Sequence, residues 1–231
     1  MVNEKRVIVA IDGPAGAGKS TIAKRIAEKL GFVYINTGAI YRTVALWSIR
    51  LGVNLSDMHR LEQLAKEAKI ELAANEGRVT LNGEDVTEAI RNPQVSEAAS
   101  KVSAVPGVRR ALLATQRDMA EQNSVVMEGR DIGSVVFPDA QVKIFLDADP
   151  QERVRRRSLE FEKQGQLADF EAVSGELKAR DERDRGRSES PLLQAPDAEL
   201  VDTTGLSLEQ VEEAVLRIVR ARISNGKEAK T

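Results

Sequence analysis

The sequence predicts an α/β fold in which a five-stranded parallel sheet is flanked by helices. Five short apolar runs occur along the chain, and helix-like segments lie between them. A short, continuous apolar run is typical of a strand that is buried on both faces, as the strands of parallel sheets are. Strands that alternate with helices are joined by right-handed crossovers, so helices cover both faces of the sheet. The expected strands are residues 7–11, 32–35, 124–127, 142–146 and 198–201.

The first helix follows the first strand closely. Ile22, Ile26 and Leu30 recur every four residues, a spacing that places them on one face of a helix. Gly31 comes directly after this pattern, where a glycine commonly ends a helix in the left-handed conformation. A second helix is expected over residues 40–51, after the second strand.

Residues 69–86 interrupt the alternation of strands and helices. Apolar and polar residues alternate there, and two turn signals, at 75–77 and 82–83, divide the segment. This pattern is typical of a small antiparallel sheet with one face in water. We therefore expect residues 56–105 to form an α+β insertion that packs on the main sheet.

Composition excludes several classes of function. The 231 residues carry a net charge of −2, which argues against broad binding of nucleic acids or anionic membranes. The chain has no cysteine and a single histidine, His59, so disulfides, thiol catalysis and cysteine- or histidine-rich metal sites are excluded. No apolar stretch approaches the ~18 residues of a membrane span, and the first run is too short for a signal peptide. We expect a cytoplasmic protein and, because nothing in the sequence requires a partner chain, a monomer.

The segment GPAGAGKST, residues 13–21, matches the phosphate-binding pattern G-x-x-x-x-G-K-[S/T]. It follows a buried strand and opens a helix, which is the context that this P-loop pattern requires. Its glycines let backbone N–H groups converge on phosphate oxygens, and the helix N-terminus adds partial positive charge. Lys19 is expected to reach the β- and γ-phosphates of a nucleotide, and Ser20 to bind Mg²⁺. The candidate ATP-binding residues here are Gly13, Pro14, Ala15, Gly16, Ala17, Gly18, Lys19, Ser20 and Thr21.

A P-loop leaves several functions open. A GTPase is disfavoured because the guanine-reading pattern N-K-x-D is absent, and the D-x-x-G at residues 202–205 follows the last strand. Ser207 and Gln210 in that region instead form a capping box for the final helix. A small-molecule kinase fits the chain length, and it requires a second substrate site with its own cationic and polar groups. A binding module that uses a nucleotide without catalysis stays open as an alternative.

Five sequence blocks stand out along the chain: residues 13–21, 36–42, 97–109, 127–148 and 179–187. In content and order they resemble those of bacterial cytidylate kinases, a family of P-loop nucleoside monophosphate kinases. The resemblance extends over about residues 7–222. It implies transfer of the γ-phosphoryl group of ATP to CMP or dCMP with Mg²⁺, although another small acceptor such as UMP stays open. It also implies that the insertion binds the monophosphate and that a short helical lid covers ATP.

The resemblance also sets the expected domain boundaries. The core comes in three parts, interrupted by the nucleoside-monophosphate-binding insertion and by the lid region with the helix that follows it. A polar tail without periodicity is expected to be disordered. The segments are 1–55 for the first core part, 56–105 for the insertion, 106–150 for the second core part, 151–184 for the lid region, 185–223 for the third core part and 224–231 for the tail.

Recognition of cytosine requires an acceptor for its amino group and donors for its ring nitrogen and carbonyl oxygen. Asp131 can accept from the amino group, while Arg109 and Ser100 can donate, and the three match the base-reading positions of the family. An unpaired buried donor or acceptor costs about 1–3 kcal/mol, so such a pocket discriminates between bases. From the sequence G-R-D alone, a turn residue beside a surface ion pair would be the more common interpretation.

The acceptor phosphate is expected to meet several cationic side chains. Arg42 and Arg130 match family positions that grip this phosphate, and the Thr37 hydroxyl supports it. Asn36 occupies a position where the family often has aspartate, and we assign it no role. The predicted catalytic residues, which would screen the repulsion between the two nucleotides, are Lys19, Arg130, Arg180 and Arg187.

Residues 179–187 place many charges of both signs on two helical turns. Arg180, Asp184 and Arg187 stand at i, i+4 and i+7, so they share one helix face. The resemblance implies that Arg180 and Asp184 hold the sugar hydroxyls of the acceptor and that Arg187 reaches the phosphates. The remaining charges fit a solvated helix surface.

Two further positions stay open. In the basic segment 152–166, Arg153 and Arg157 at i and i+4 are the best candidates to contact ATP phosphates, although a basic helix is usually a solvated face. Glu128, directly after a predicted strand, either orients Mg²⁺ through water or caps a turn.

Overall fold

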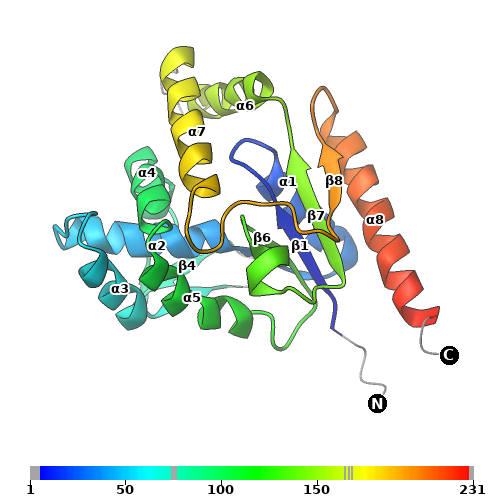
Figure 1. Cartoon of the computed structure of the whole chain (residues 1–231), viewed down its shortest axis with the longest axis horizontal. Helices are drawn as coiled ribbons and strands as arrows, with labels where there is room; N and C mark the ends of the chain where they lie inside the picture. The colour runs from blue at the N-terminus through cyan, green and yellow to red at the C-terminus, as the bar shows by residue number, and fades with distance from the viewer. Residues whose placement is uncertain (1–5, 74–76, 164, 166, 168, 229–231) are drawn as a thin grey trace.

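A five-stranded parallel sheet forms the centre of the molecule (Figure 1). The computed structural model describes residues 6–228 except 74–76, 164, 166 and 168. The strand order is β2-β6-β1-β7-β8, and each neighbouring pair is parallel, which confirms the predicted fold. The strands are β1 (Ile8–Asp12), β2 (Val33–Asn36), β6 (Val125–Glu128), β7 (Val142–Asp147) and β8 (Glu199–Asp202).

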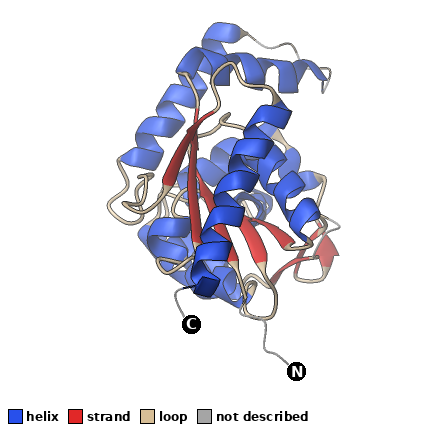
Figure 2. Cartoon of the chain, turned by 90° about the vertical axis from the view of Figure 1, so that its right-hand side faces the viewer, coloured by secondary structure: helices blue, strands red, loops and turns tan. Residues whose placement is uncertain are grey.

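Helices cover both faces of this sheet (Figure 2). On one face, α1 (Lys19–Leu30) and α8 (Leu208–Glu228) bury their apolar sides against β1 and β7. On the other face, a single helical turn, Ile132–Val136, packs against β1, β2 and β6. Gly31 ends α1 in the left-handed conformation with φ 67°, as its position predicts.

The insertion has the predicted α+β character. Its sheet is antiparallel, in the order β3-β4-β5. The hydrophobic core of this region also includes residues of α2 and α5, such as Ile40 and Leu112, so the packed unit extends beyond 56 and 105. The elements are α2 (Thr37–Arg50), α3 (Met58–Glu67), β3 (Ile70–Leu72), β4 (Val79–Leu81), β5 (Glu84–Asp85), η1 (Ala89–Arg91), α4 (Pro93–Val102) and α5 (Pro106–Asp118).

Two helices, α6 (Pro150–Lys163) and α7 (Phe170–Arg185), pack against each other beyond the carboxyl ends of the strands (Figure 1). They occupy the region in which the sequence predicts a lid. At the chain's end, α8 continues to Glu228, so the helix extends into residues 224–231, where a disordered tail is predicted; residues 229–231 lie outside the described part. Among the described residues, none of the helices has the length and hydrophobicity needed to span a membrane.

Candidate active site

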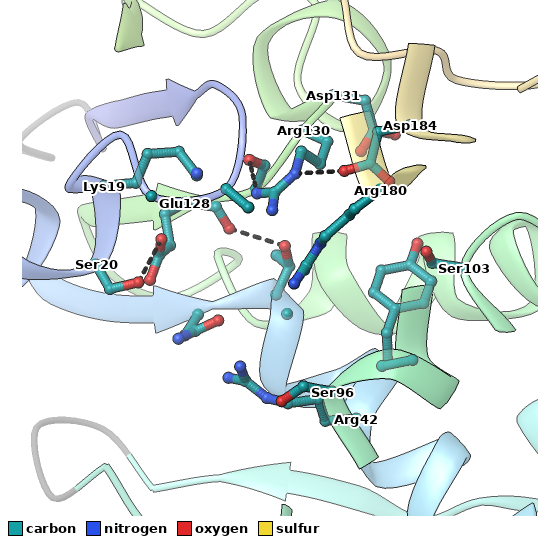
Figure 3. Close-up of a pocket in the computed structure, with 18 of the residues that line it drawn as sticks. Lys19, Ser20, Arg42, Ser96, Ser103, Glu128, Arg130, Asp131, Arg180 and Asp184 are labelled. Carbon is teal, nitrogen blue, oxygen red and sulfur yellow. Dashed lines mark hydrogen bonds and ion pairs between the residues drawn. The ribbon is translucent and has the colours of Figure 1, made fainter. Parts of the chain in front are cut away.

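A cavity of about 210 Å³ lies where three of the parallel strands end. The residues at or just after the carboxyl ends of β1, β2 and β6 line it, together with residues of α2, α4 and α7 (Figure 3). In open α/β sheets, ligands bind in this crevice at the carboxyl ends of the strands. The fold therefore gathers segments far apart in the sequence around one polar hollow.

The P-loop shapes one wall of the cavity. Gly13 has φ 146°, and a Cβ atom there would lie 1.9 Å from the carbonyl oxygen of Leu146, so only glycine fits. Gly18 precedes α1 in the left-handed conformation, with φ 87°. Backbone N–H groups at the start of α1 consequently border the cavity, as an anion-binding loop requires.

Lys19 lies inside this loop rather than in solvent. Its side chain is only 6% exposed, and Nζ donates to the carbonyl oxygen of Pro14 at 2.6 Å. Burial lowers the pKa of Lys19 well below its ordinary value, and the nearby positive charge of Arg130 lowers it further. A polyanion beside Lys19 would compensate both effects, because it favours the charged ammonium.

Glu128 connects the P-loop to the end of β6. Its Oε2 accepts a hydrogen bond from the Ser20 hydroxyl at 2.9 Å, and its Oε1 accepts from the Tyr34 hydroxyl at 2.5 Å. The Glu128 backbone carbonyl accepts from the Thr37 hydroxyl at 2.8 Å. Ser20 and Glu128 thus present hydroxyl and carboxylate oxygens side by side, which is the ligand chemistry that Mg²⁺ prefers. Neither this geometry nor the contact with Tyr34 was predicted from the sequence.

Four arginines from different segments line the same cavity as Lys19: Arg42 from α2, Arg130 after β6, Arg180 from α7 and Arg187 after it. Figure 3 shows Lys19, Arg42, Arg130 and Arg180 around a common space. Burial lowers the pKa of Arg180 to about 10, with the charge of Arg130 as the next cause. This crowding of like charges is costly unless an anion binds between them.

Asp184 of α7 contacts two of these arginines, Arg130 and Arg187. It is 1% exposed, and it accepts hydrogen bonds from Arg130 Nε at 2.9 Å and from Arg187. Burial alone would raise the pKa of Asp184, but Arg130 and Arg187 hold it below its ordinary value. Arg187 also donates to the Ser103 hydroxyl at 2.8 Å, which links the end of α7 to the insertion.

Two of the three predicted base-reading residues, Arg109 and Asp131, line the cavity side by side. Arg109 and Asp131 form a buried ion pair, and the Arg109 guanidinium lies 5.4 Å from the centre of the Tyr41 ring. Ser100 is not among the residues that line the cavity, and its buried hydroxyl has no hydrogen-bond partner in the described part of the chain. Ser103 lines the cavity instead, and its hydroxyl also donates to the Ser100 carbonyl.

Sequence reasoning missed Ser103 as well as Ser96, although both border the cavity. The signal for Ser103 was present, because it stands three residues after Ser100 in the block 97–109. Tyr41 is only 7% exposed and also lines the cavity.

The two lid arginines differ in position. Arg157 lines the cavity, pairs with Glu160 at 2.8 Å and lies 4.4 Å from the centre of the Phe161 ring. Arg153 lies under the P-loop, where its guanidinium donates to the carbonyl oxygen of Ala15 at 3.1 Å. The structure thus brings Arg157, but not the Arg153 side chain, to the cavity wall. Gly13, Pro14 and Ala17 form the buried base of the loop.

Comparison with known proteins decides the family. A sequence model described as cytidylate kinase matches residues 9–221. This chain belongs to the cytidylate kinase family. Curated cytidylate kinases are similar along their whole length: that of Solibacter usitatus (strain Ellin6076) is 60% identical over 97% of both chains, and that of Geobacter sulfurreducens (strain ATCC 51573 / DSM 12127 / PCA) is 50% identical over 94% of both.

Solved structures of other proteins share the architecture of this cytidylate kinase family member. A gluconokinase from Sinorhizobium meliloti 1021 superimposes with a TM-score of 0.51 at 16% identity, covering 98% of both chains. An uncharacterized protein from Eubacterium ventriosum ATCC 27560 gives a TM-score of 0.50 at 13% identity. At such low identity these similarities concern the fold alone.

Proposed function

We propose that this protein transfers the γ-phosphoryl group of ATP to CMP or dCMP, giving ADP and CDP or dCDP. The observation that carries the proposal is the gathering of Lys19, Arg42, Arg130, Arg180 and Arg187 around one cavity beside the P-loop. Two nucleotides that must meet end to end repel each other, and fixed positive charges offset that repulsion. A protein that only bound ATP would not need cations on the far side of the cavity.

On the donor side, the loop of residues 13–21 would bind the phosphates of ATP through backbone N–H groups, and Lys19 would contact the β- and γ-phosphates. Ser20 would hold Mg²⁺, with the adjacent Glu128 carboxylate orienting the site. When bound, the ion neutralises charge on the β- and γ-phosphates. Arg157 would reach the ATP phosphates from the lid.

On the acceptor side, Arg42, Arg130 and the Thr37 hydroxyl would grip the phosphate of CMP. This phosphate has a second pKa near ~6, so it is largely dianionic at neutral pH and needs no general base. Arg187 would extend the positive surface between the two phosphate sites. Arg180 and Asp184 would hold the sugar hydroxyls.

The base would be read by Asp131, Arg109 and the neighbouring serines. Asp131 and Arg109 already face each other as a buried ion pair, so their side chains are oriented before a base binds. Ser100 has a buried hydroxyl with unused hydrogen-bonding capacity within the described residues, which suits a donor that a bound base would satisfy. A mismatched base would leave one of these groups unpaired, at a cost of about 1–3 kcal/mol.

Closure of the cavity would exclude water and so suppress hydrolysis of ATP. The insertion and α7 already touch through Ser103 and Arg187, so a movement of either would reshape the acceptor end of the cavity. That the enzyme acts as a monomer in the cytoplasm, and that it binds no nucleic acid, stay predictions from composition.

A panel of acceptors tests the proposal directly. ADP release from ATP is measured with CMP, dCMP, UMP, AMP, GMP and shikimate in turn. We expect turnover with CMP and dCMP far above that with the other acceptors. Preferential turnover of UMP or shikimate would contradict the proposed acceptor, and ATP binding without acceptor-stimulated ADP release would indicate a binding module.

A further inference from the structure

Arg153 is buried beneath the P-loop, at the start of α6. Its Nε donates to the carbonyl oxygen of Ala148 at 3.2 Å, and its second guanidinium nitrogen donates to the carbonyl oxygen of Ala15 at 3.1 Å. The planar guanidinium therefore joins the end of β7 to the tip of the P-loop. A lysine at this position could not make both contacts with the same geometry, because its charge is a single point at the end of a flexible stem.

The same guanidinium reaches α7. Arg153 forms an ion pair with Asp181 at 2.6 Å, and the two side chains are only 7% and 14% exposed. The second oxygen of Asp181 is buried and has no hydrogen-bond partner in the described part of the chain, so Arg153 is its main polar contact there. An ion pair with so little solvent contact is screened much less than a surface pair.

Apolar contacts at the same place make the connection stiff. Ala15 of the P-loop packs with Val154 of α6 and with Val173 and Leu177 of α7 in one small buried cluster. A Cβ atom at Gly16 would lie 3.0 Å from the Cβ of Arg153, so the loop lies directly on α6. The P-loop, α6 and α7 thus form one packed unit.

Positions of α7 adjacent to Asp181 carry predicted acceptor-binding residues. Arg180 and Asp184, on either side of Asp181 in the sequence, both line the cavity. Asp184 in turn accepts hydrogen bonds from Arg130 and Arg187. One short helix segment is therefore linked to the donor loop by Asp181, through Arg153, while its neighbours Arg180 and Asp184 line the cavity.

We propose that Arg153 and Asp181 are a positioning pair that makes the binding of the two nucleotides interdependent. Phosphates that settle in the P-loop fix the backbone at Ala15, and the ion pair conveys that position to α7 and so to Arg180 and Asp184. The inference rests on the proposed function, because it requires both a donor and an acceptor site. It gives Arg153 a role through the loop and α7 in place of a direct contact with ATP.

The test is a measurement of binding by calorimetry. The affinity for CMP is determined alone and with a saturating, non-hydrolysable ATP analogue plus Mg²⁺, and the ratio of the two is the coupling factor. We expect the wild-type protein to bind CMP at least about fivefold more tightly when the analogue is bound, and to show the same factor in the reverse experiment. Asp181→Asn keeps the shape of the side chain and removes its charge, and we expect its coupling factor to fall below about twofold.

Two further variants complete the test. Arg153→Lys keeps the positive charge but loses the planar guanidinium, and it should lower the coupling factor as Asp181→Asn does. This variant also tests the inference if Asp181→Asn does not fold. Glu182→Gln removes the same charge from the adjacent, exposed position of α7 and should leave the coupling factor at its wild-type value.

The outcomes separate the possible failures. A purely structural role would lower the melting temperature of the folded variants and leave the coupling factor unchanged, which would overturn the inference. A wild-type coupling factor of one would overturn it as well. A wild-type protein that binds the ATP analogue but neither binds nor phosphorylates CMP would instead contradict the proposed function.

Discussion

Asp12 shows how one buried carboxylate holds two parts of the site in register. It lies at the end of β1, directly before the P-loop, and accepts hydrogen bonds from the backbone N–H groups of Ile132 and Gly133, both at 2.8 Å. Those N–H groups follow Arg130 and Asp131, the predicted phosphate- and base-binding residues. Burial raises the pKa of Asp12 to about 6, although the two hydrogen bonds oppose the change. The position of Asp131 therefore depends on a charge that is costly to bury.

The raised pKa of Asp12 predicts a pH dependence of stability. Because the native state binds this proton more tightly than the unfolded chain does, the free energy of unfolding falls as the pH rises from about 4 through about 6. Asp12→Asn should remove this contribution. Relative to the variant, the wild-type protein should lose about 3 kcal/mol at most between pH 4 and pH 7. Urea unfolding of both proteins across this range measures the difference, and parallel pH profiles would contradict the prediction.

Lys19 should matter far more for turnover than for folding. Burial of its ammonium lowers the pKa of Lys19, which shows that the charged group does not stabilise the fold. Lys19→Ala should therefore change the melting temperature little. Loss of a charge fixed beside the transferring phosphoryl group should lower kcat by roughly 10²–10³-fold. Steady-state kinetics and thermal unfolding of Lys19→Ala are compared with those of Lys24→Ala, an exposed lysine of the same helix. A folded Lys19→Ala enzyme with normal turnover would remove Lys19 from the mechanism.

At the scale of elements, local sequence patterns were sufficient to predict the strands of the main sheet. Each expected strand of the main sheet lies within a residue or two of the structure, because a continuous apolar run fits only a position buried on both faces. The antiparallel sheet of the insertion was equally clear from its alternation. The continuation of α8 to Glu228 could not be predicted in the same way, because its last turns lack the apolar periodicity that marks a helix.

The contacts of individual side chains depend on tertiary packing, which the spacing of residues along the sequence does not reveal. Arg153 and Arg157 share a helix face by spacing, yet the P-loop covers the first of them and the cavity begins at the second. Ser100 and Ser103 pose the same problem one helical turn apart, and only the fold shows which one borders the cavity. Periodicity therefore identified the correct helix faces, while long-range contacts determined what each residue on a face touches.

The turn between β1 and α1 should tolerate no side chain at its first position. In Gly13→Ala, the new Cβ would overlap the carbonyl oxygen of Leu146 on β7, so strand and loop would have to separate. We expect a loss of several kcal/mol of stability, or a failure to fold. Gly31→Ala is the matched control: its φ is also positive, at 67°, but the space around it is open, so only backbone strain of about 1–2 kcal/mol applies. Equal melting temperatures for the two variants would contradict the steric argument.

At the scale of the whole molecule, the charge is unevenly distributed. The chain as a whole has a net charge of −2, whereas the side chains that line the site cavity include seven cationic and four acidic groups. The cavity lining is thus net positive, whereas the rest of the chain is net negative. Such a surface concentrates electric field and attracts anionic ligands selectively, while the slightly negative exterior does not.

This distribution predicts that salt weakens substrate capture more than it weakens catalysis. At 0.1 M ionic strength the Debye length is about 10 Å, so added salt screens the attraction of a nucleotide from outside the cavity but acts less on buried contacts. Between about 20 and 300 mM KCl at constant free Mg²⁺, kcat/KM for CMP should fall several-fold while kcat changes little. Arg42→Gln removes one cation of the cavity and should flatten this dependence. Arg50→Gln removes a partly exposed arginine of the same helix, which is paired with Glu84 of β5, and should leave the dependence unchanged. If both variants kept the wild-type slope, attraction by the cavity would not be what brings the substrate in.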